Sequence, residues 1–297
     1  MRLYSRNWTR REIEARTGRL EQIGGLRRWQ ATEGPEAGVE MIRVRTGAGL
    51  AYTVLPSRGM DISLAEFGSV PLSWQSAGGE AHPAYFDPTG AEWLRTAAGG
   101  LVMTCGLTQV GAPNIDEGQE LGIHGRAHHL PARQVVAEGQ WSGDEYDWQI
   151  AGVIEETIAF GDHLRLRREI RGRLGENRIL IHDRVENAGF APAPHMILYH
   201  CNFGFPLMSE KTTTEFPSRR VVARDEGTPI DGYDSWQPPQ PDFTERVYYH
   251  EELATDDGRW ATATIHNPRF PLPAGPCDLT VLLKWRPDQL PRLVQWK

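Results

Sequence analysis

The sequence has few cysteines and no paired cysteine motif. Its three cysteines, Cys105, Cys201 and Cys277, lie far apart among 297 residues, and no Cys-x-x-Cys pair occurs. The odd count and loose spacing favour reduced thiols in a cytoplasm over a disulfide framework. They also argue against a zinc ribbon or a redox dithiol. We therefore expect a cytoplasmic protein.

Long hydrophobic runs and an excess of positive charge are also missing. No apolar stretch approaches the roughly 18–20 residues that a membrane helix needs. The first twelve residues contain basic side chains without an apolar stretch after them, so a secretory signal is not expected. The net charge of −7 and the pI of about 5.8 argue against nucleic acid and, less strongly, against anionic membranes as partners.

Several catalytic fingerprints are absent as well. The chain has no phosphate-binding glycine loop, no Gly-x-Ser-x-Gly elbow and no dinucleotide-binding motif. It has no repeat of fixed period and no shift in composition that would mark a domain boundary. A single domain over residues 1–297 is therefore predicted, with residues 1–37 as an N-terminal helical extension packed on it.

The pattern of apolar residues predicts one helix followed by many strands. Thr9 and Glu12 form a capping-box pattern, and a sparse apolar stripe then runs to Ile23 before two glycines. From Gly38 onward the apolar period changes to two, and turn residues separate the runs. This predicts an all-β fold, a large antiparallel β-sandwich. The predicted strands are 39–45, 49–55, 148–160, 163–172, 178–186, 193–200, 219–224, 259–266 and 278–285. A short helix is expected within 85–98 and an irregular loop at 235–244.

Two histidines stand out as candidates for chemistry. His124 precedes Gly125, which permits close backbone approach to a ligand, and His200 ends an apolar strand-like run. Histidine is the side chain best able to move protons near neutral pH. Arg126 adds a fixed cation suited to sugar hydroxyls or an acidic substituent. The alternative for His124 is a turn histidine, and for His200 it is a hydrogen-bonded core histidine. For Arg126 the alternative is a surface arginine.

These two lines, Glu-Leu-Gly-Ile-His-Gly-Arg and Met-Ile-Leu-Tyr-His-Cys-Asn-Phe-Gly, resemble the histidine motifs of the galactose mutarotase (aldose 1-epimerase) superfamily, and within it the DUF4432 branch. The resemblance implies a mutarotase-type β-sandwich that interconverts sugar anomers without a cofactor. It implies that His200 is the general acid at the ring oxygen and that His124 helps to hold that oxygen. Asn202 follows His200 as a substrate-binding candidate. The implied partner is a small-molecule carbohydrate. The sequence leaves open whether the protein forms a homodimer.

Four further residues are candidates for substrate binding. Arg58 and Asp61 lie in a polar segment that resembles the Arg-Gly-Met-Asp line of the DUF4432 branch, and a structural ion pair is the alternative. Asp231 ends a Gly-Thr-Pro-Ile-Asp segment that resembles a sugar-binding segment of mutarotases. His250 is a third histidine candidate, for which a polar strand end is the alternative.

The glutamate that acts as the base in this superfamily has no convincing match before Lys297. The chain ends within a strand-like run, so residues beyond Lys297 are expected. The missing base supports a rival interpretation, a non-catalytic carbohydrate-binding protein on the same fold. A second rival is a cupin-type metal enzyme, because His124, His128 and His129 are clustered. Adjacent histidines in a strand would point to opposite faces, so no metal is expected.

Two structural expectations follow. His124 and His200 should approach one another across a concave β surface, because both lie beside strand ends. Aromatic side chains such as Trp74, Tyr199 or Trp236 would stack on a sugar, although most tryptophans fill cores.

Overall fold

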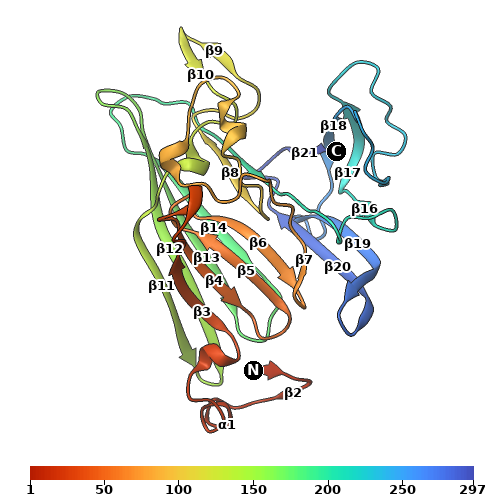
Figure 1. Ribbon diagram of the computed structural model, residues 1–297. Coiled ribbons are helices and arrows are strands. Elements are labelled where there is room, and N and C mark those ends of the chain that lie inside the picture. The colour runs from red at the N-terminus through yellow and green to blue at the C-terminus, as the bar shows by residue number, and fades with distance from the viewer. The chain divides into compact units, whose positions relative to one another are not determined.

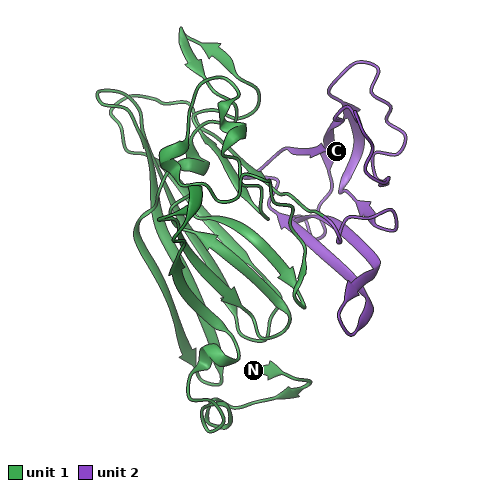
Figure 2. Cartoon of the chain, in the orientation of Figure 1, with its two compact units in different colours: residues 1–204 green, residues 205–297 purple.

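A computed structural model describes all residues, 1–297, and divides the chain into two compact units. Unit 1 is Met1–Gly204 and unit 2 is Phe205–Lys297 (Figure 2). The single domain expected from the sequence stays a prediction. Strands dominate both units (Figure 1). None of the helices is both long and apolar enough to cross a membrane.

Unit 1 contains two large antiparallel sheets. The first has the order β3–β4–β5–β6–β7 and the second the order β11–β12–β13–β14. The bounds are β3 (Gly25–Gln30), β4 (Glu40–Arg45), β5 (Leu50–Leu55), β6 (Asp61–Phe67), β7 (Val70–Pro71), β11 (Arg133–Ser142), β12 (Glu145–Thr157), β13 (His163–Arg173) and β14 (Leu180–Asn187). Neighbouring strands in each sheet follow one another in the chain, as hairpins produce.

The two sheets pack against each other through alternate side chains. On β12, Trp148, Ile150 and Ile154 are buried, while Gln149, Ala151 and Glu155 are more exposed. The indole nitrogen of Trp148 donates to the hydroxyl of Tyr52 on the opposite sheet at 3.4 Å. Each fully buried aliphatic side chain contributes about 1.5–3 kcal/mol to folding. The predicted all-β sandwich is thus confirmed.

A two-stranded ribbon carries the polar residues of interest. It pairs β8 (Met103–Leu107) with β15 (Met196–His200), and His200 lies opposite Met103. The ribbon buries Met103, Cys105 and Leu198 against Trp93 on one face. Thr104 and Tyr199 pair across the ribbon and lie on its other face, because successive strand residues alternate.

Unit 2 consists of two three-stranded antiparallel sheets. One has the order β16–β19–β20 and the other β17–β18–β21 (Figure 1). The bounds are β16 (Thr213–Glu215), β17 (Ser218–Ala223), β18 (Val247–Leu253), β19 (Ala261–Leu272), β20 (Gly275–Trp285) and β21 (Leu293–Trp296). Its core forms around Ala261, Ala263 and Trp285. Residues 235–244 form an irregular loop, as predicted.

The N-terminal segment differs from the predicted helix. Helix α1 spans only Arg10–Glu14, although Thr9 and Glu12 form the predicted capping box. A separate 3₁₀ turn, η1 (Leu20–Gln22), and strand β3 follow it. Only Ile13 of α1 is buried, so tertiary packing does not support a longer helix. The helix expected within 85–98 is likewise only a 3₁₀ turn, η4 (Glu92–Arg95).

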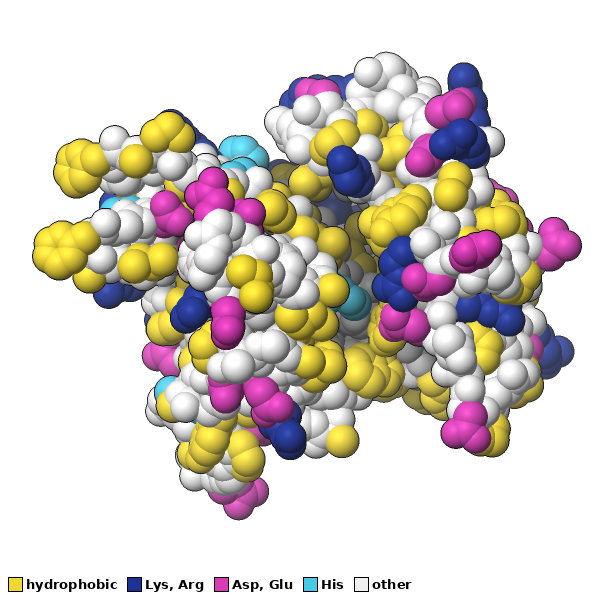
Figure 3. All heavy atoms as spheres, turned by 90° about the horizontal axis from the view of Figure 1, so that it is seen from above, with side chains coloured by type: hydrophobic (Ala, Val, Ile, Leu, Met, Phe, Trp, Pro, Cys, Tyr) yellow, Lys and Arg dark blue, Asp and Glu magenta, His cyan; other side chains and the backbone are white.

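The remaining elements of unit 1 are short. They are β1 (Arg2–Leu3), β2 (Arg6–Asn7), η2 (Gly34–Glu36), η3 (Pro83–Tyr85), β9 (Asn114–Asp116), β10 (Gln119–Leu121) and η5 (Ala127–His129). The face drawn in Figure 3 shows acidic and basic side chains interspersed. Surface salt bridges also occur, for example between Arg28 and Glu40.

Candidate functional site

His124 and His200 meet in unit 1. His200 is the last residue of β15, and His124 lies in the loop that leads from β10 to η5. Their ring centroids are 5.6 Å apart, and the rings are nearly perpendicular at 84°. The expected approach of the two histidines is therefore found, whereas their catalytic roles stay predictions.

The backbone around His124 determines where its ring carries a proton. The Gly111 N–H donates to Nδ1 of His124 at 3.2 Å, so Nδ1 is an acceptor and the neutral ring holds its proton on Nε2. Burial, together with the nearby His200 and His128, lowers the pKa of His124 to about 4. His124 is thus a neutral imidazole near pH 7 that presents an Nε2–H donor.

Gly125 allows this loop to lie directly against β8. Its φ is +71°, and a Cβ atom there would lie 2.5 Å from the carbonyl oxygens of both Gln109 and Gly106. The Gly106 N–H donates to the His124 carbonyl at 3.0 Å, and the Arg126 N–H donates to the Gly106 carbonyl at 2.9 Å. A residue without a side chain is therefore required beside His124.

We expect Gly125→Ala to destabilise the protein by about 1–3 kcal/mol, since the added methyl group forces backbone to move. Gly143→Ala is the matched control, because Gly143 also has a positive φ, +60°, but no atom lies within 4 Å of its added Cβ. Urea denaturation of both variants measures the difference. Equal losses of stability in the two variants would show that the positive φ, and not the close approach of the backbone, is what requires glycine at position 125.

Asn202 holds the chain just beyond His200. Its side-chain amide is buried and donates to the carbonyls of His200 at 3.1 Å and Gly100 at 2.9 Å. Both hydrogens of the amide are therefore used inside the protein. Burial lowers the pKa of His200, although its contact with Asn202 acts in the opposite direction. Asn202 positions the end of β15, and its contact with a substrate stays a prediction.

His128 and His129 differ from the sequence interpretation. They lie on the 3₁₀ turn η5 and not on a strand, and both rings contact the guanidinium of Arg58. Nη2 of Arg58 is 2.6 Å from Nε2 of His128 and 3.3 Å from Nε2 of His129. The turn brings the two rings to a centroid distance of 4.6 Å. The expectation that they point to opposite faces is wrong.

Arg58 and Asp61 are joined through His128. Asp61 accepts a hydrogen bond from Nδ1 of His128, while Arg58 donates to Nε2 of the same ring. Arg58 also donates to the Thr96 carbonyl at 2.6 Å, and burial lowers its pKa to about 10. Arg58 is 0% and Asp61 1% exposed, so neither side chain is open to a substrate in this structure. Their burial favours the structural alternative, with an imidazole between the two charges.

The same network also occupies both nitrogens of His128. A ring whose two nitrogens are hydrogen-bonded has no lone pair for a metal unless one of these bonds breaks. Burial, followed by the charge of Arg58, lowers the pKa of His128. The geometry therefore gives no support to a metal centre built on this histidine.

The sequence interpretation missed an extension of the network on β13 and β14. Arg168 is fully buried, and its Nη1 donates to Oγ1 of Thr104 at 2.6 Å and to Asp61 at 3.3 Å. Its Nη2 donates to Asp183 at 2.6 Å, and the hydroxyl of Tyr199 donates to the same carboxylate oxygen at 2.6 Å. A signal was available in the sequence, because Arg168 has the same strand parity as the buried Leu164, Leu166 and Ile170.

The sequence interpretation also missed Trp93 on η4, whose ring lies close to three histidine rings. Its ring centroid is 5.2 Å from that of His124, 5.4 Å from that of His128 and 6.0 Å from that of His129. Its indole N–H is buried and has no hydrogen-bond partner in the protein. Buried donors without acceptors are rare, and they are most often explained by a function or by a bound water or ion.

None of the other three candidates has a side chain that is hydrogen-bonded to this network. Arg126 is the N-cap residue just before η5, and its side chain is exposed. Asp231 is an exposed residue of unit 2. His250, also in unit 2, is buried, and its two ring nitrogens contact Ser218 at 2.8 Å and Gln295 at 3.2 Å. Those contacts favour the alternative of a strand residue held by its neighbours, and a role in substrate binding stays a prediction.

Comparison with solved structures found several similar chains. A candidate aldose 1-epimerase from Klebsiella pneumoniae subsp. pneumoniae is 25% identical and has a TM-score of 0.80, over 92% of this chain and 70% of that one. Slr1438 protein from Synechocystis sp. PCC 6803 is 14% identical with a TM-score of 0.51, over 87% and 84% of the two chains. A galactose mutarotase-like protein from Clostridium acetobutylicum is 10% identical with a TM-score of 0.48, over 83% and 82%.

No curated protein matches the chain. The family model described as a domain of unknown function, DUF4432, matches residues 36–297. That match covers most of the chain, including both histidine lines and all of unit 2. As its histidine motifs predicted, this chain belongs to the DUF4432 family.

Proposed function

We propose that this protein is an aldose 1-epimerase-like isomerase that interconverts the anomers of a sugar without a cofactor. The observation that carries the proposal is the His124–His200 pair, whose ring centroids are 5.6 Å apart. The likeness to a candidate aldose 1-epimerase supports the reaction class. Fold similarity alone does not establish a function, so the proposal depends on the pair.

Each histidine has a distinct part in the proposed reaction. His200 gives a proton to the ring oxygen while a base takes the proton of the anomeric hydroxyl, and the ring opens. Rotation about the C1–C2 bond and ring closure then yield the other anomer. His124, neutral with its proton on Nε2, donates a hydrogen bond to the same oxygen. A preorganised donor of this kind stabilises the charge that develops during the reaction.

The lowered pKa of His200 predicts how the rate depends on pH. Burial disfavours the charged ring, so the pKa lies below its ordinary value of 6.5 and the acid form is depleted at pH 8. We expect kcat/KM to rise about tenfold per unit as the pH falls from 8 toward this pKa, because one proton on His200 is required. Saturation-transfer NMR, corrected for uncatalysed exchange, measures the profile. A rate that increases with pH would contradict this role for His200.

A non-catalytic carbohydrate-binding protein is the second candidate. The lowered pKa values of His124 and His200 favour it, because neutral imidazoles offer hydrogen bonds more readily than protons near pH 7. Saturation-transfer NMR on a panel of neutral and acidic aldoses separates the two candidates. An isomerase transfers magnetisation between anomers of at least one sugar. A binding protein shows ligand signals without transfer between anomers.

A further inference from the structure

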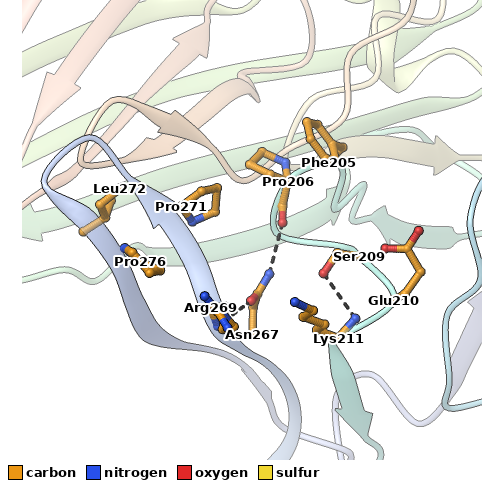
Figure 4. Close-up of a pocket in the computed structure, with 10 residues that line it drawn as sticks. All are labelled: Phe205, Pro206, Ser209, Glu210, Lys211, Asn267, Arg269, Pro271, Leu272 and Pro276. Carbon is orange, nitrogen blue, oxygen red and sulfur yellow. Dashed lines mark hydrogen bonds between the residues drawn. The ribbon is translucent and has the colours of Figure 1, made fainter.

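A groove of about 510 Å³ lies wholly within unit 2 and shares no residue with the histidine site (Figure 4). One wall is the β19–β20 hairpin, and the other is the segment that begins at Phe205 and ends at Lys211. Pockets that hold small ligands commonly have volumes of about 300–1,000 Å³. The groove is therefore large enough for a monosaccharide.

Asn267 joins the two walls. Its side chain is buried at 2% exposure, and Nδ2 donates to the carbonyls of Pro206 at 3.1 Å and Leu207 at 2.9 Å. Its Oδ1 accepts from the backbone N–H of Arg269 at 2.9 Å. One buried amide thus fixes the segment that carries Phe205 against the strand that carries Arg269, and the groove is held in shape before any ligand binds.

A β-bulge places Arg269 at the groove. The pairing of β19 with β20 shifts between Asn267 and Phe270, so the residues between them leave the regular ladder. Phe270 returns to the core with 0% exposure, whereas Arg269 is exposed. Bulges redirect side chains and are frequent beside functional sites.

The charges at the groove favour an anionic ligand. Arg269 and Lys211 take part in none of the salt bridges of unit 2, whereas Arg220, Lys284 and Arg286 are each paired with a carboxylate. Figure 4 shows Lys211 extended toward the Asn267–Arg269 wall. One carboxylate, Glu210, also lines the groove, but it forms a salt bridge with neither cation. The two cations therefore outnumber the carboxylate, and the local potential favours an anion.

The groove also offers an apolar surface. Phe205 is 82% exposed although its backbone neighbour Pro206 is buried. An exposed aromatic ring beside charged donors suits a ligand that has one apolar face and one charged group. We propose that this groove binds a sugar with one anionic substituent, a carboxylate or a phosphate. The anion lies between Lys211 and Arg269, and the C–H face of the sugar lies on Phe205.

Calorimetric titration of the full chain tests this site. The probes are D-glucuronate, D-glucose 6-phosphate and D-glucose at low ionic strength. We expect both charged sugars to bind at least tenfold more tightly than glucose, and R269Q to weaken their binding about tenfold or more, since hydrogen bonds to charged groups are among the strong ones. R219Q is the matched control, because Arg219 is an exposed, unpaired arginine of the same unit outside the groove. Binding of only one charged sugar would identify its anion as the group recognised.

Three results would overturn the proposal. The first is equal affinity for glucose and for the charged sugars, or no binding of any probe at 10 mM, on the order of the weakest specific sites. The second is an equal effect of R219Q and R269Q. The third is loss of the Arg269-dependent binding in H200Q, which would assign the titration to the histidine site. Retention of that binding in H200Q keeps this proposal independent of the proposed isomerase activity.

Discussion

His200→Gln is expected to reduce anomer exchange by about 10²–10⁴-fold, the usual contribution of a general acid, while sugar binding and folding change little. Glutamine can keep a hydrogen bond with the sugar, but it cannot deliver a proton near neutral pH. The measurement is saturation-transfer NMR with a sugar that the wild type exchanges.

The matched control is His195→Gln, an exposed histidine in the loop before β15. It removes the same ring from the same unit and should leave exchange unchanged. If H200Q exchanges the sugar as fast as the wild type, His200 is not the acid, even though the fold is correct. If the wild type binds sugars but exchanges none, the carbohydrate-binding alternative holds.

Arg168→Met is expected to lower the free energy of unfolding by about 3–5 kcal/mol, because it leaves buried carboxylates without their cation. Asp183 and Asp61 both lie within hydrogen-bond distance of Arg168, and all three side chains are almost completely buried. Urea denaturation of both proteins gives the difference.

Arg171→Met is the control for Arg168, since Arg171 lies on the same strand with a side chain 56% exposed and pairs with Glu169 on the surface. Its loss should cost about 0–1 kcal/mol. Tyr199→Phe serves if Arg168→Met does not fold, because it removes only the hydroxyl that donates to Asp183 and should cost about 1.5–3 kcal/mol. Variants as stable as the wild type would show that the buried network does not stabilise unit 1.

The regular strands were the part of the fold that local pattern could predict. On β13, and over Trp148–Ala151 of β12, buried and more exposed residues alternate because one face is buried and the other meets water. The predicted runs 148–160 and 163–172 accordingly match these strands to within a few residues. Strand β8 was not predicted, because all five of its residues are buried and its sequence, Met-Thr-Cys-Gly-Leu, has no alternation.

The histidine pair could be predicted from sequence motifs, whereas the residues that surround it could not. A glycine after His124 and a polar turn after His200 indicated two strand-end histidines, and the structure brings these together. The rings near them come from η4 and η5, two 3₁₀ turns that leave no periodic pattern in a sequence. Trp93 and His128 could therefore not be placed beside the pair in advance.

By itself, the sequence determined the family, the all-β class, the capping box at Thr9 and the need for glycine beside His124, because each depends on residues close together in the chain. Tertiary structure alone decided that Arg58, His128 and Asp61 form one buried chain of hydrogen bonds extended by Arg168. These residues come from three segments separated by tens of positions. Burial makes each charge depend on partners that only packing of the two sheets can supply.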